Sequence, residues 1–301
     1  MMIDIAGKRF WFFLISGVVI LAGIIFLAVF GLKPGVEFSS GSMLTINFEK
    51  EVNQVELRKE LANLGYPNAI VQSTGGGDFF IRTSELTGEE KTALENALTA
   101  KFGNAAEREF YSVSPMVAAE TVHNAAIAMG VAAVGILLYV TWAFRRMPNP
   151  FHYGTCAIIA LVHDVLVATG IFSILGNILG WEVNLMFITG ILAIIGYSIN
   201  NTVVVFDRIR ENLRKGASAD FEVVVNNSLV ETLGRCFNTS LTTIFALLAL
   251  LLFVGASIQN FTVVFLIGLI AGTFSSICIA PTLLVVWEKG EWGRFLHPAR
   301  A

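Results

Sequence analysis

The stretch GYSINNTVVVFDRIRE, residues 196–211, decides the fold class of this chain. It completes an apolar segment long enough to cross a bilayer, carries the adjacent amides Asn200 and Asn201, and ends in alternating charges. Hydrocarbon penalises unpaired polar groups, so amides at this depth must face protein or a water-lined path. The segment therefore indicates both a membrane protein and the place where that protein works.

The composition predicts membrane spans along most of the chain. Of the 301 residues, 55% are hydrophobic and 14% are charged, whereas soluble domains are about a quarter charged. The apolar residues cluster in blocks of about 20, the length that spans a hydrocarbon core about 30 Å thick. We therefore predict a polytopic α-helical membrane protein with six spans, near residues 10–31, 122–144, 152–175, 183–206, 233–255 and 261–287.

The basic residues predict the orientation of these spans. Residues 10–32 are too long for a cleavable signal and lack a small-residue cleavage site, so we expect a retained first span. Lysine and arginine concentrate at the N-terminus, in alternate connections and in the tail, which places both termini in the cytoplasm by the positive-inside rule. Segment 33–120 and the loops near Glu182 and Ser257–Gln259 then lie outside. The basic residues concerned are Lys8, Arg9, Arg145, Arg146, Arg208, Arg210, Arg214, Lys215, Lys289, Arg294 and Arg300.

Segment 33–120 is the sizeable soluble unit. Its periodicities follow the order β-α-β-β-α-β, which is the pattern of a small α+β ferredoxin-like domain. Thr87, with Glu90 three residues later, predicts the capped start of its second helix. The expected strands are 42–49, 69–73, 79–83 and 109–113, the expected helices are 52–64 and 87–102, and glycines 75–77 form a turn. The predicted domains are 1–32 (cytoplasmic N-terminus and first span), 33–120 (periplasmic domain), 121–287 (spans two to six) and 288–301 (cytoplasmic tail).

Common signatures of catalysis are missing. Ser198 follows Gly196 but lacks the second glycine of a nucleophile elbow, and the sequence contains no P-loop. The three cysteines fall inside predicted spans, and no third ligand stands at suitable spacing from His163 and Asp164 to hold a metal. The outer segment is more acidic than basic, which gives no reason to expect nucleic acid. We therefore predict a protein that is not an enzyme, has no cofactor or metal, and draws energy from an ion gradient or a partner.

Asp164 is a candidate for ion coupling. It lies near the middle of the third predicted span, where an ionisable group costs roughly 2.5–3.5 kcal/mol on insertion scales. A residue kept there implies a partner or a water path, and the adjacent His163 strengthens this interpretation. The alternative is a structural aspartate that hydrogen-bonds backbone or hydroxyl groups between helices.

Polar residues of the fourth span are further candidates. Tyr197, Ser198 and Asn201 fall within one helical turn and can present a polar patch on one face. The patch serves either ion movement or hydrogen bonding between helices. Because an amide cannot carry a proton, Asn200 and Asn201 would act by orienting water or another residue.

Arg235 lies at or slightly inside the predicted start of the fifth span, with Thr239 and Thr242 on the same helical face. Its guanidinium either snorkels to the interface or stays inside. In the second case the guanidinium would pair with a carboxylate of another helix and keep that carboxylate charged. Protonation of the carboxylate would then break the pair.

Two other motifs have mainly structural interpretations. Asp207, Arg208 and Arg210 form the charged exit of the fourth span, which is typical of a solvated anchor and alternatively couples to a partner. The pair Gly268 and Gly272 in the last span favours ordinary close helix packing over a specific dimer motif.

These residues resemble the SecF family, the smaller subunits of the SecDF accessory complex of the bacterial Sec translocon. The resemblance covers essentially the whole chain, including the order of the spans and the outer domain between the first two. It is carried by FGLKPGVEFSSG (30–41), VHDV (162–165), the run 196–211 and LGRCFNTS (233–240).

The resemblance implies an RND-superfamily architecture, in which the helices of SecF pair pseudo-symmetrically with those of SecD. It implies a role in pulling or releasing preproteins on the outer side of the inner (cytoplasmic) membrane, driven by a proton or sodium gradient. The implied partners are SecD, the SecYEG channel, YajC, YidC, unfolded preprotein and the lipid bilayer.

One position departs from the family pattern. Where the family usually has an aspartate thought to translocate ions near the arginine matched by Arg235, this chain has Asn201. Three explanations stay open: a natural variant that leaves proton carriage to SecD, an engineered mimic of the protonated state, or a paralogue with altered ion coupling. The leading hypothesis is a gradient-driven translocation subunit. The alternatives are a non-transporting scaffold that tethers SecD and other factors to the channel, and a different RND-type exporter, against which the single small outer domain argues.

Overall fold

The structure, a computed structural model, describes residues 4–73, 77–253 and 258–292. The described chain divides into two compact units, which are treated separately below. The first comprises residues up to 32, 128–178 and 186 onward, and the second comprises residues 33–127 and 179–185. The second unit thus ends later than the predicted boundary at 120 and adds the connection between the third and fourth spans.

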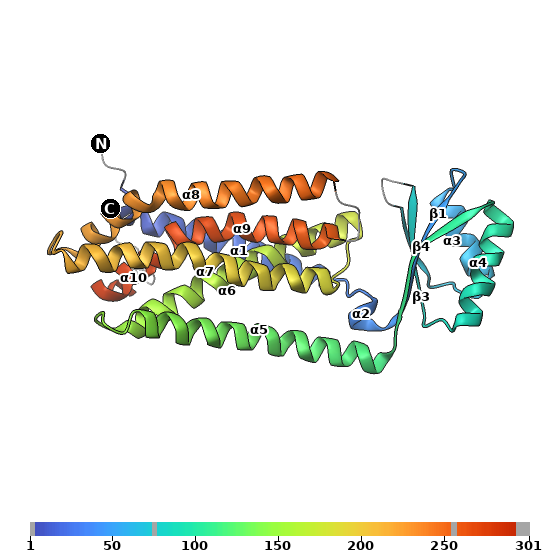
Figure 1. The fold of residues 1–301 in the computed structure, drawn as a ribbon, viewed down its shortest axis with the longest axis horizontal. Coiled ribbons are helices and arrows are strands. Elements are labelled where there is room, and N and C mark those ends of the chain that lie inside the picture. Colours follow the sequence, from blue (N-terminus) through green and yellow to red (C-terminus); the bar gives the residue numbers. More distant parts are fainter. Residues whose placement is uncertain (1–3, 74–76, 254–257, 293–301) are drawn as a thin grey trace. The chain divides into compact units, whose positions relative to one another are not determined.

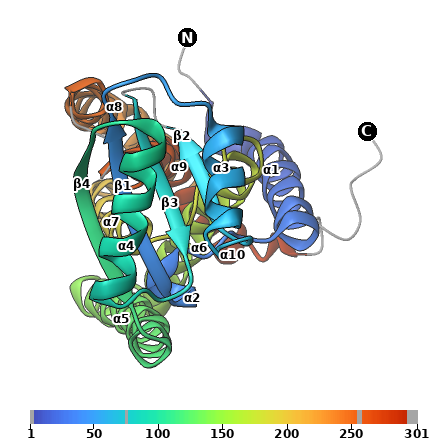
Figure 2. The ribbon, with the colours of Figure 1, turned by 90° about the vertical axis from the view of Figure 1, so that its right-hand side faces the viewer.

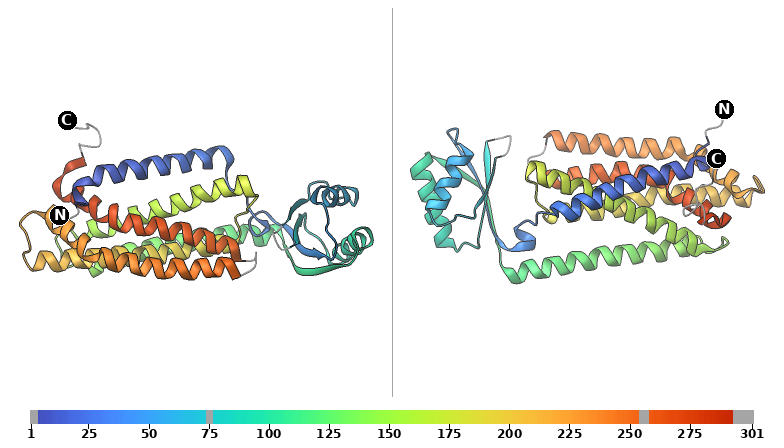
Figure 3. Two further views of the ribbon diagram at one scale, coloured as in Figure 1. Left: turned by 90° about the horizontal axis from the view of Figure 1, so that it is seen from above. Right: turned by 180° about the vertical axis from the view of Figure 1, so that it is seen from behind.

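Six helical segments are long and apolar enough to cross a membrane (Figures 1 and 3). This confirms the predicted polytopic helical membrane fold with a small sheet domain. The segments are η1 (Ala6–Lys8) with α1 (Arg9–Phe30), α5 (Pro115–Ala143), α6 (Pro150–Leu179), α7 (Leu185–Arg214), α8 (Phe221–Phe253), and α9 (Gln259–Cys278) with α10 (Ala280–Lys289).

Several helices extend beyond the predicted spans. Helix α7 begins at Leu185 and continues to Arg214, through the charged exit that was expected to follow the span. Helix α8 begins at Phe221, well before the predicted start at 233, because Val225, Leu229 and other residues at helical spacing are buried although charged residues lie between them. Arg235 therefore lies near the middle of α8, not at its start.

Small residues set the close approaches between helices in the first unit. A Cβ atom added at Gly170 of α6 would lie 2.7 Å from the Cα of Gly23 in α1, so the two backbones cross almost in contact. A Cβ at Gly268 of α9 would lie 2.1 Å from Cδ1 of Ile194 in α7. The glycine pair of the last span, Gly268 and Gly272, therefore serves close helix packing within this chain, as predicted from the sequence.

The second unit is a four-stranded antiparallel sheet in the order β2-β3-β1-β4. Its two longer helices cover one face of the sheet (Figure 2). The core between these helices and the sheet contains Leu44, Leu57, Ile81 and Leu98. The strands are β1 (Gly41–Phe48), β2 (Ile70–Ser73), β3 (Asp78–Thr83) and β4 (Ala105–Val113), and the helices are α2 (Val36–Ser39), α3 (Gln54–Asn63) and α4 (Gly88–Phe102).

Local signals of this domain agree with the structure. Thr87 caps α4, and Glu90 completes the predicted capping box. Strand β4 starts at Ala105, four residues before the predicted start. Of the predicted glycine turn, Gly75 and Gly76 lie outside the described residues, as do Ser257 and residues 293–301 of the predicted tail.

The connection 179–185 pairs with the chain that follows the first span. The backbone N–H of Gly35 donates to the carbonyl of Val183, and the N–H of Val183 donates to the carbonyl of Lys33, each at 2.7 Å. The predicted fourth span began at residue 183, but this bridge holds Val183 outside the helix.

Candidate functional site

Asp164 is the centre of a buried hydrogen-bonded cluster in the first unit. It lies at the midpoint of α6 and its side chain is fully buried. Ser198 of α7 donates to its Oδ2 at 2.5 Å, and Ser275 of α9 donates to the same oxygen at 2.8 Å. The other oxygen, Oδ1, lies 2.9 Å from Nδ1 of His163. The carboxyl group therefore joins α6 to α7 and α9.

His163 extends this cluster to the first helix. Its Nε2 lies 2.9 Å from the hydroxyl of Ser16 in α1, and its ring is 7% exposed. A groove of about 400 Å³ lies between α1, α6 and α9. Its lining residues are apolar except for His163 and Ser16. Asp164 is thus the inner member of a His–Asp pair, and His163 is the outer member.

The absence of a side chain at Gly272 allows this cluster to close. A Cβ atom at that position would lie 3.1 Å from Cβ of Ser198 and 3.3 Å from Oδ2 of Asp164. A glycine there brings α9 close enough for Ser275, one turn further along, to reach the carboxyl group. The glycine motif of the last span therefore positions a polar site as well as a helix crossing.

Asn201 belongs to a separate polar cluster. Its side chain is 3% exposed, and its Nδ2 donates to the hydroxyl of Ser240 in α8 at 3.1 Å. Thr273 of α9 donates to the same hydroxyl at 2.7 Å. Tyr197, one turn earlier, donates to the carbonyl of Thr239 at 2.8 Å. The predicted polar patch is therefore divided, because Tyr197 and Asn201 face α8 whereas Ser198 faces α6.

Asn200 and Arg235 lie on open surface of the first unit. Both residues are exposed, although each stands well inside a long apolar helix. Among the described residues, the Arg235 guanidinium makes no hydrogen bond or ion pair, and Asn201 does not contact it. Thr239 donates to the backbone carbonyl of Arg235 at 2.8 Å, which confirms that the two share one face of α8. Asn200 also lines an open hollow with Tyr139, Tyr197 and neighbouring apolar residues.

With this geometry in place, the chain can be compared with known proteins. The family described as "Protein export membrane protein SecD/SecF, C-terminal" matches residues 93–290, and the SecD/SecF GG motif matches residues 25–52. The chain belongs to the SecD/SecF family. It is 44% identical to the protein translocase subunit SecF of Thermobaculum terrenum, over 98% of this chain and 97% of that protein.

Two longer relatives contain a SecF-like part. The chain is 34% identical to the protein translocase subunit SecDF of Bacillus subtilis, over 96% of this chain but 38% of that protein. The crystal structure of the translocon-associated membrane protein SecDF from Thermus thermophilus matches with a TM-score of 0.86 and 30% identity, over 96% of this chain and 39% of that one. The suspected SecF resemblance is therefore confirmed at the level of family and fold.

The charged exit of α7 in this SecD/SecF family member is a set of local ion pairs. Arg210 pairs with Asp207, and Arg208 pairs with Glu211 and with Glu231 of α8. These groups are partly exposed, so each pair contributes little to stability. The arrangement supports a solvated helix end, and coupling of this motif to a partner stays a prediction.

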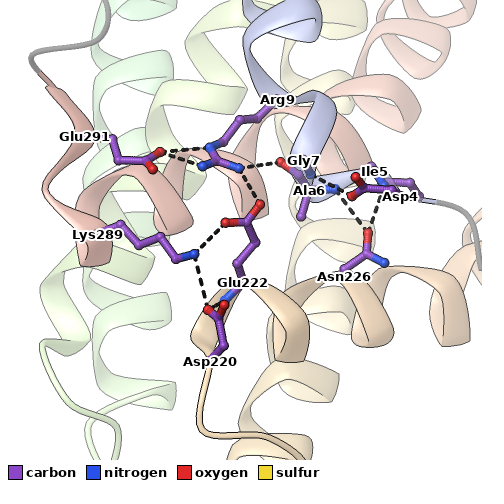
Figure 4. A network of polar contacts seen from close by, with 10 residues as sticks. All are labelled: Asp4, Ile5, Ala6, Gly7, Arg9, Asp220, Glu222, Asn226, Lys289 and Glu291. Atoms are coloured by element: carbon purple, nitrogen blue, oxygen red, sulfur yellow. Dashed lines mark hydrogen bonds and ion pairs between the residues drawn. The ribbon is translucent and has the colours of Figure 1, made fainter. Parts of the chain in front are cut away.

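A second charged network joins the two described ends of the chain (Figure 4). Arg9 is 4% exposed and pairs at 2.6 Å with both Glu222 of α8 and Glu291 after α10. Lys289 pairs with Glu222 at 2.5 Å and with Asp220 at 3.2 Å. Arg9 and Lys289, expected only as orientation signals, therefore also connect α1, α8 and α10.

Sequence reasoning missed the hydroxyl partners of the site. Ser16, Ser240, Thr273 and Ser275 are single hydroxyls in apolar segments, which carry no distinctive local pattern. The available signal was weak: a hydroxyl inside a span is a common hydrogen-bonding partner for a polar residue of another helix. Only the packing selects which of them face Asp164 or Asn201.

Proposed function

We propose that this chain is the SecF-type subunit of a SecDF complex that assists Sec-dependent preprotein translocation, using the proton or sodium gradient. It would act without covalent chemistry, as a subunit that changes conformation. We place it in the inner membrane with both termini in the cytoplasm, as the distribution of basic residues favours. The small sheet domain would then lie on the outer side, where it would meet unfolded preprotein.

The names of the relatives support a SecD-type partner. SecDF of Bacillus subtilis is named as one subunit, of which 38% matches this chain, whereas SecF of Thermobaculum terrenum is named as a subunit of its own and matches over 97% of its length. We therefore propose SecD as the partner that completes the assembly. We extend the proposal to the SecYEG channel, with YajC and YidC as further partners.

The observation that carries the proposal is the exposure of Asn200 on α7 and of Arg235 on α8. An uncovered amide and guanidinium on membrane-crossing helices are costly in hydrocarbon. Helices of a partner would cover these groups, and a carboxylate on one of them would pair with Arg235. Protonation of that carboxylate would weaken the pair and bias a two-state arrangement of the helices.

Because Asn201 cannot carry a proton, we assign ion carriage to the partner's carboxylate. The test uses membrane vesicles that contain this chain and SecD, and follows late preprotein translocation after ATP is exhausted, with and without a gradient. We expect Arg235→Ala to abolish the gradient-dependent phase while the complex still assembles, with Arg235→Lys retaining part of it. Loss of assembly in Arg235→Ala would assign Arg235 a structural role instead.

The second candidate is a non-conducting scaffold that tethers SecD and accessory factors to the channel. The neutral Asn201, buried in a hydrogen bond to Ser240, favours it. The discriminating experiment replaces the spans with inert helices and keeps the outer domain. Full export by that chimera would favour the scaffold and contradict gradient coupling through the spans.

A further inference from the structure

The buried pair His163 and Asp164 is a titratable group that the proposed coupling through Arg235 does not use. Ser198 and Ser275 donate to Asp164, Ser16 contacts His163, and the ring of Phe274 lies against the imidazole with centroids 6.2 Å apart. These contacts come from α1, α7 and α9, the elements packed around α6 at this point. In the described parts of the chain, no lysine, arginine or second carboxylate pairs with Asp164.

The charge of such a pair is constrained by its burial. An isolated buried carboxylate is strongly unfavourable in an apolar interior. The pair stays neutral overall only when it holds one proton, either on Asp164 beside a neutral imidazole or on His163 as an imidazolium beside a carboxylate. Two arrangements of one proton are therefore available across a contact of 2.9 Å between Nδ1 and Oδ1.

We propose that His163 and Asp164 form a mid-membrane proton-binding dyad, whose proton position is transmitted to α7 and α9 through Ser198 and Ser275. With the proton on His163, the Asp164 carboxylate accepts both serine hydroxyls at Oδ2. When the proton moves from Nδ1 of His163 to Oδ1 of Asp164, Oδ2 becomes the carbonyl oxygen of a neutral acid and accepts both hydroxyls less strongly. Proton movement therefore changes the strength of the bonds that hold α6 to α7 and α9. This proposal rests on the proposed function in one respect, namely that the gradient supplies the proton.

The position of the dyad determines how a proton can reach it. His163 and Ser16 lie in the wall of a groove whose exposed surface is otherwise apolar, so a proton would reach the imidazole through transient water and not through a lined water path. The imidazole is the outer member and can pass a proton inward by using both ring nitrogens. On α7, Ser198 lies one turn before Asn201, so the dyad places a proton acceptor beside the segment whose own amide cannot titrate.

A direct test measures the protonation of His163. The chain has four histidines, so nitrogen-15 NMR of histidine-labelled full-length protein in lipid nanodiscs, with His163→Gln for assignment, isolates its signal. We expect the ring nitrogens of the unmodified protein to report both arrangements of the shared proton as the pH is varied, and those of Asp164→Asn, which lacks the second acceptor, to report one. A single neutral tautomer at every pH, in both proteins, would overturn the dyad.

A matched control lies on the same helix. Among the described residues, His152 and Glu288 form a second His–carboxylate pair, with Nδ1 and Oε1 3.0 Å apart and both side chains partly exposed. Glu288→Gln should leave the gradient-dependent phase of export unchanged, whereas Asp164→Asn should reduce it at least about tenfold. Equal export by these two variants would contradict the coupling role.

Ser198→Ala separates proton binding from transmission. It keeps both members of the dyad but removes the bond to α7, so the shared proton should still be seen on the His163 ring while the gradient-dependent phase declines. If Asp164→Asn does not assemble, this variant and the NMR titration of the unmodified protein still decide the proposal. If Arg235→Ala leaves gradient-dependent export intact while Asp164→Asn abolishes it, the proposed partner coupling fails and the dyad stands.

Discussion

Helix α7 presents two polar surfaces that differ in how they are completed. On one, Ser198 and Asn201 are buried and bonded to α6 and α8 of the same chain. On the other, Asn200 is exposed, as is Arg235 on α8. The hydrogen bonds of the first surface are made within the chain, whereas Asn200 and Arg235 have no side-chain partner among the described residues. Polar residues of one span can therefore serve folding inside the chain and assembly outside it.

The largest expected effect breaks the closed surface. Asp164→Leu leaves Ser198, Ser275 and His163 without their acceptor, so we expect a loss of about 3–5 kcal/mol in unfolding free energy. Arg235→Leu removes an uncovered guanidinium that hydrocarbon penalises, so it should leave the stability of the isolated chain unchanged or raise it. Denaturant unfolding in micelles measures both, and similar losses would contradict the distinction between the surfaces.

Asn201→Asp tests whether the closed surface tolerates a charge. The new carboxyl would be buried against Ser240, and a buried carboxylate favours the protonated form. Because only the protonated carboxyl is neutral in this buried position, the variant should be more stable at low pH than at neutral pH. We expect a loss of about 1–3 kcal/mol in unfolding free energy at neutral pH. Thermal melting curves recorded at several pH values measure this loss.

The same variant tests ion coupling at this position. Export should gain dependence on the gradient, and the absence of such a gain would count against an ion role here.

A third prediction concerns the crossing of α1 and α6 at Gly170. Gly170→Ala places a Cβ 2.7 Å from the backbone of Gly23, so α1 and α6 must separate, at a cost of about 1–3 kcal/mol. The matched control is Gly17→Ala on α1, where a Cβ meets nothing within 4 Å. Reduced hydrogen-exchange protection in α1 for the first variant alone would support the close crossing, and unchanged protection in both would refute it.

The smallest expected effect concerns a carboxyl at the N-terminal end of α7. Burial raises the pKa of Glu37, although its own backbone N–H, the Tyr111 hydroxyl and the N–H of Leu185 donate to the carboxyl. Because the folded form binds the proton more tightly, stability of the sheet domain should decline as the pH rises through that raised pKa. Glu37→Gln should flatten this dependence, as measured by hydrogen exchange in β1. A steeper dependence would show that the carboxylate form is the one that stabilises the domain.

Much of the fold followed from local patterns. The six spans were predicted because an apolar block of sufficient length is recognisable without any tertiary contact. The capping box at Thr87 and Glu90 and the order of the small domain are likewise encoded within short segments. Helix ends were less predictable, as α8 shows, since its first turns carry charges on one side and buried residues on the other.

The sequence by itself determined that Asp164, His163 and the two asparagines lie inside membrane spans, because depth in a span depends only on position in an apolar block. Tertiary structure alone decided their partners. Ser16, Ser198 and Ser275 come from three helices that meet α6 at one level, and no spacing in the sequence records that meeting. Asn200 and Asn201 are adjacent, yet successive residues on a helix point about 100° apart. One amide is therefore enclosed against α8 and the other is left exposed, because packing fixes which side of α7 faces its neighbours.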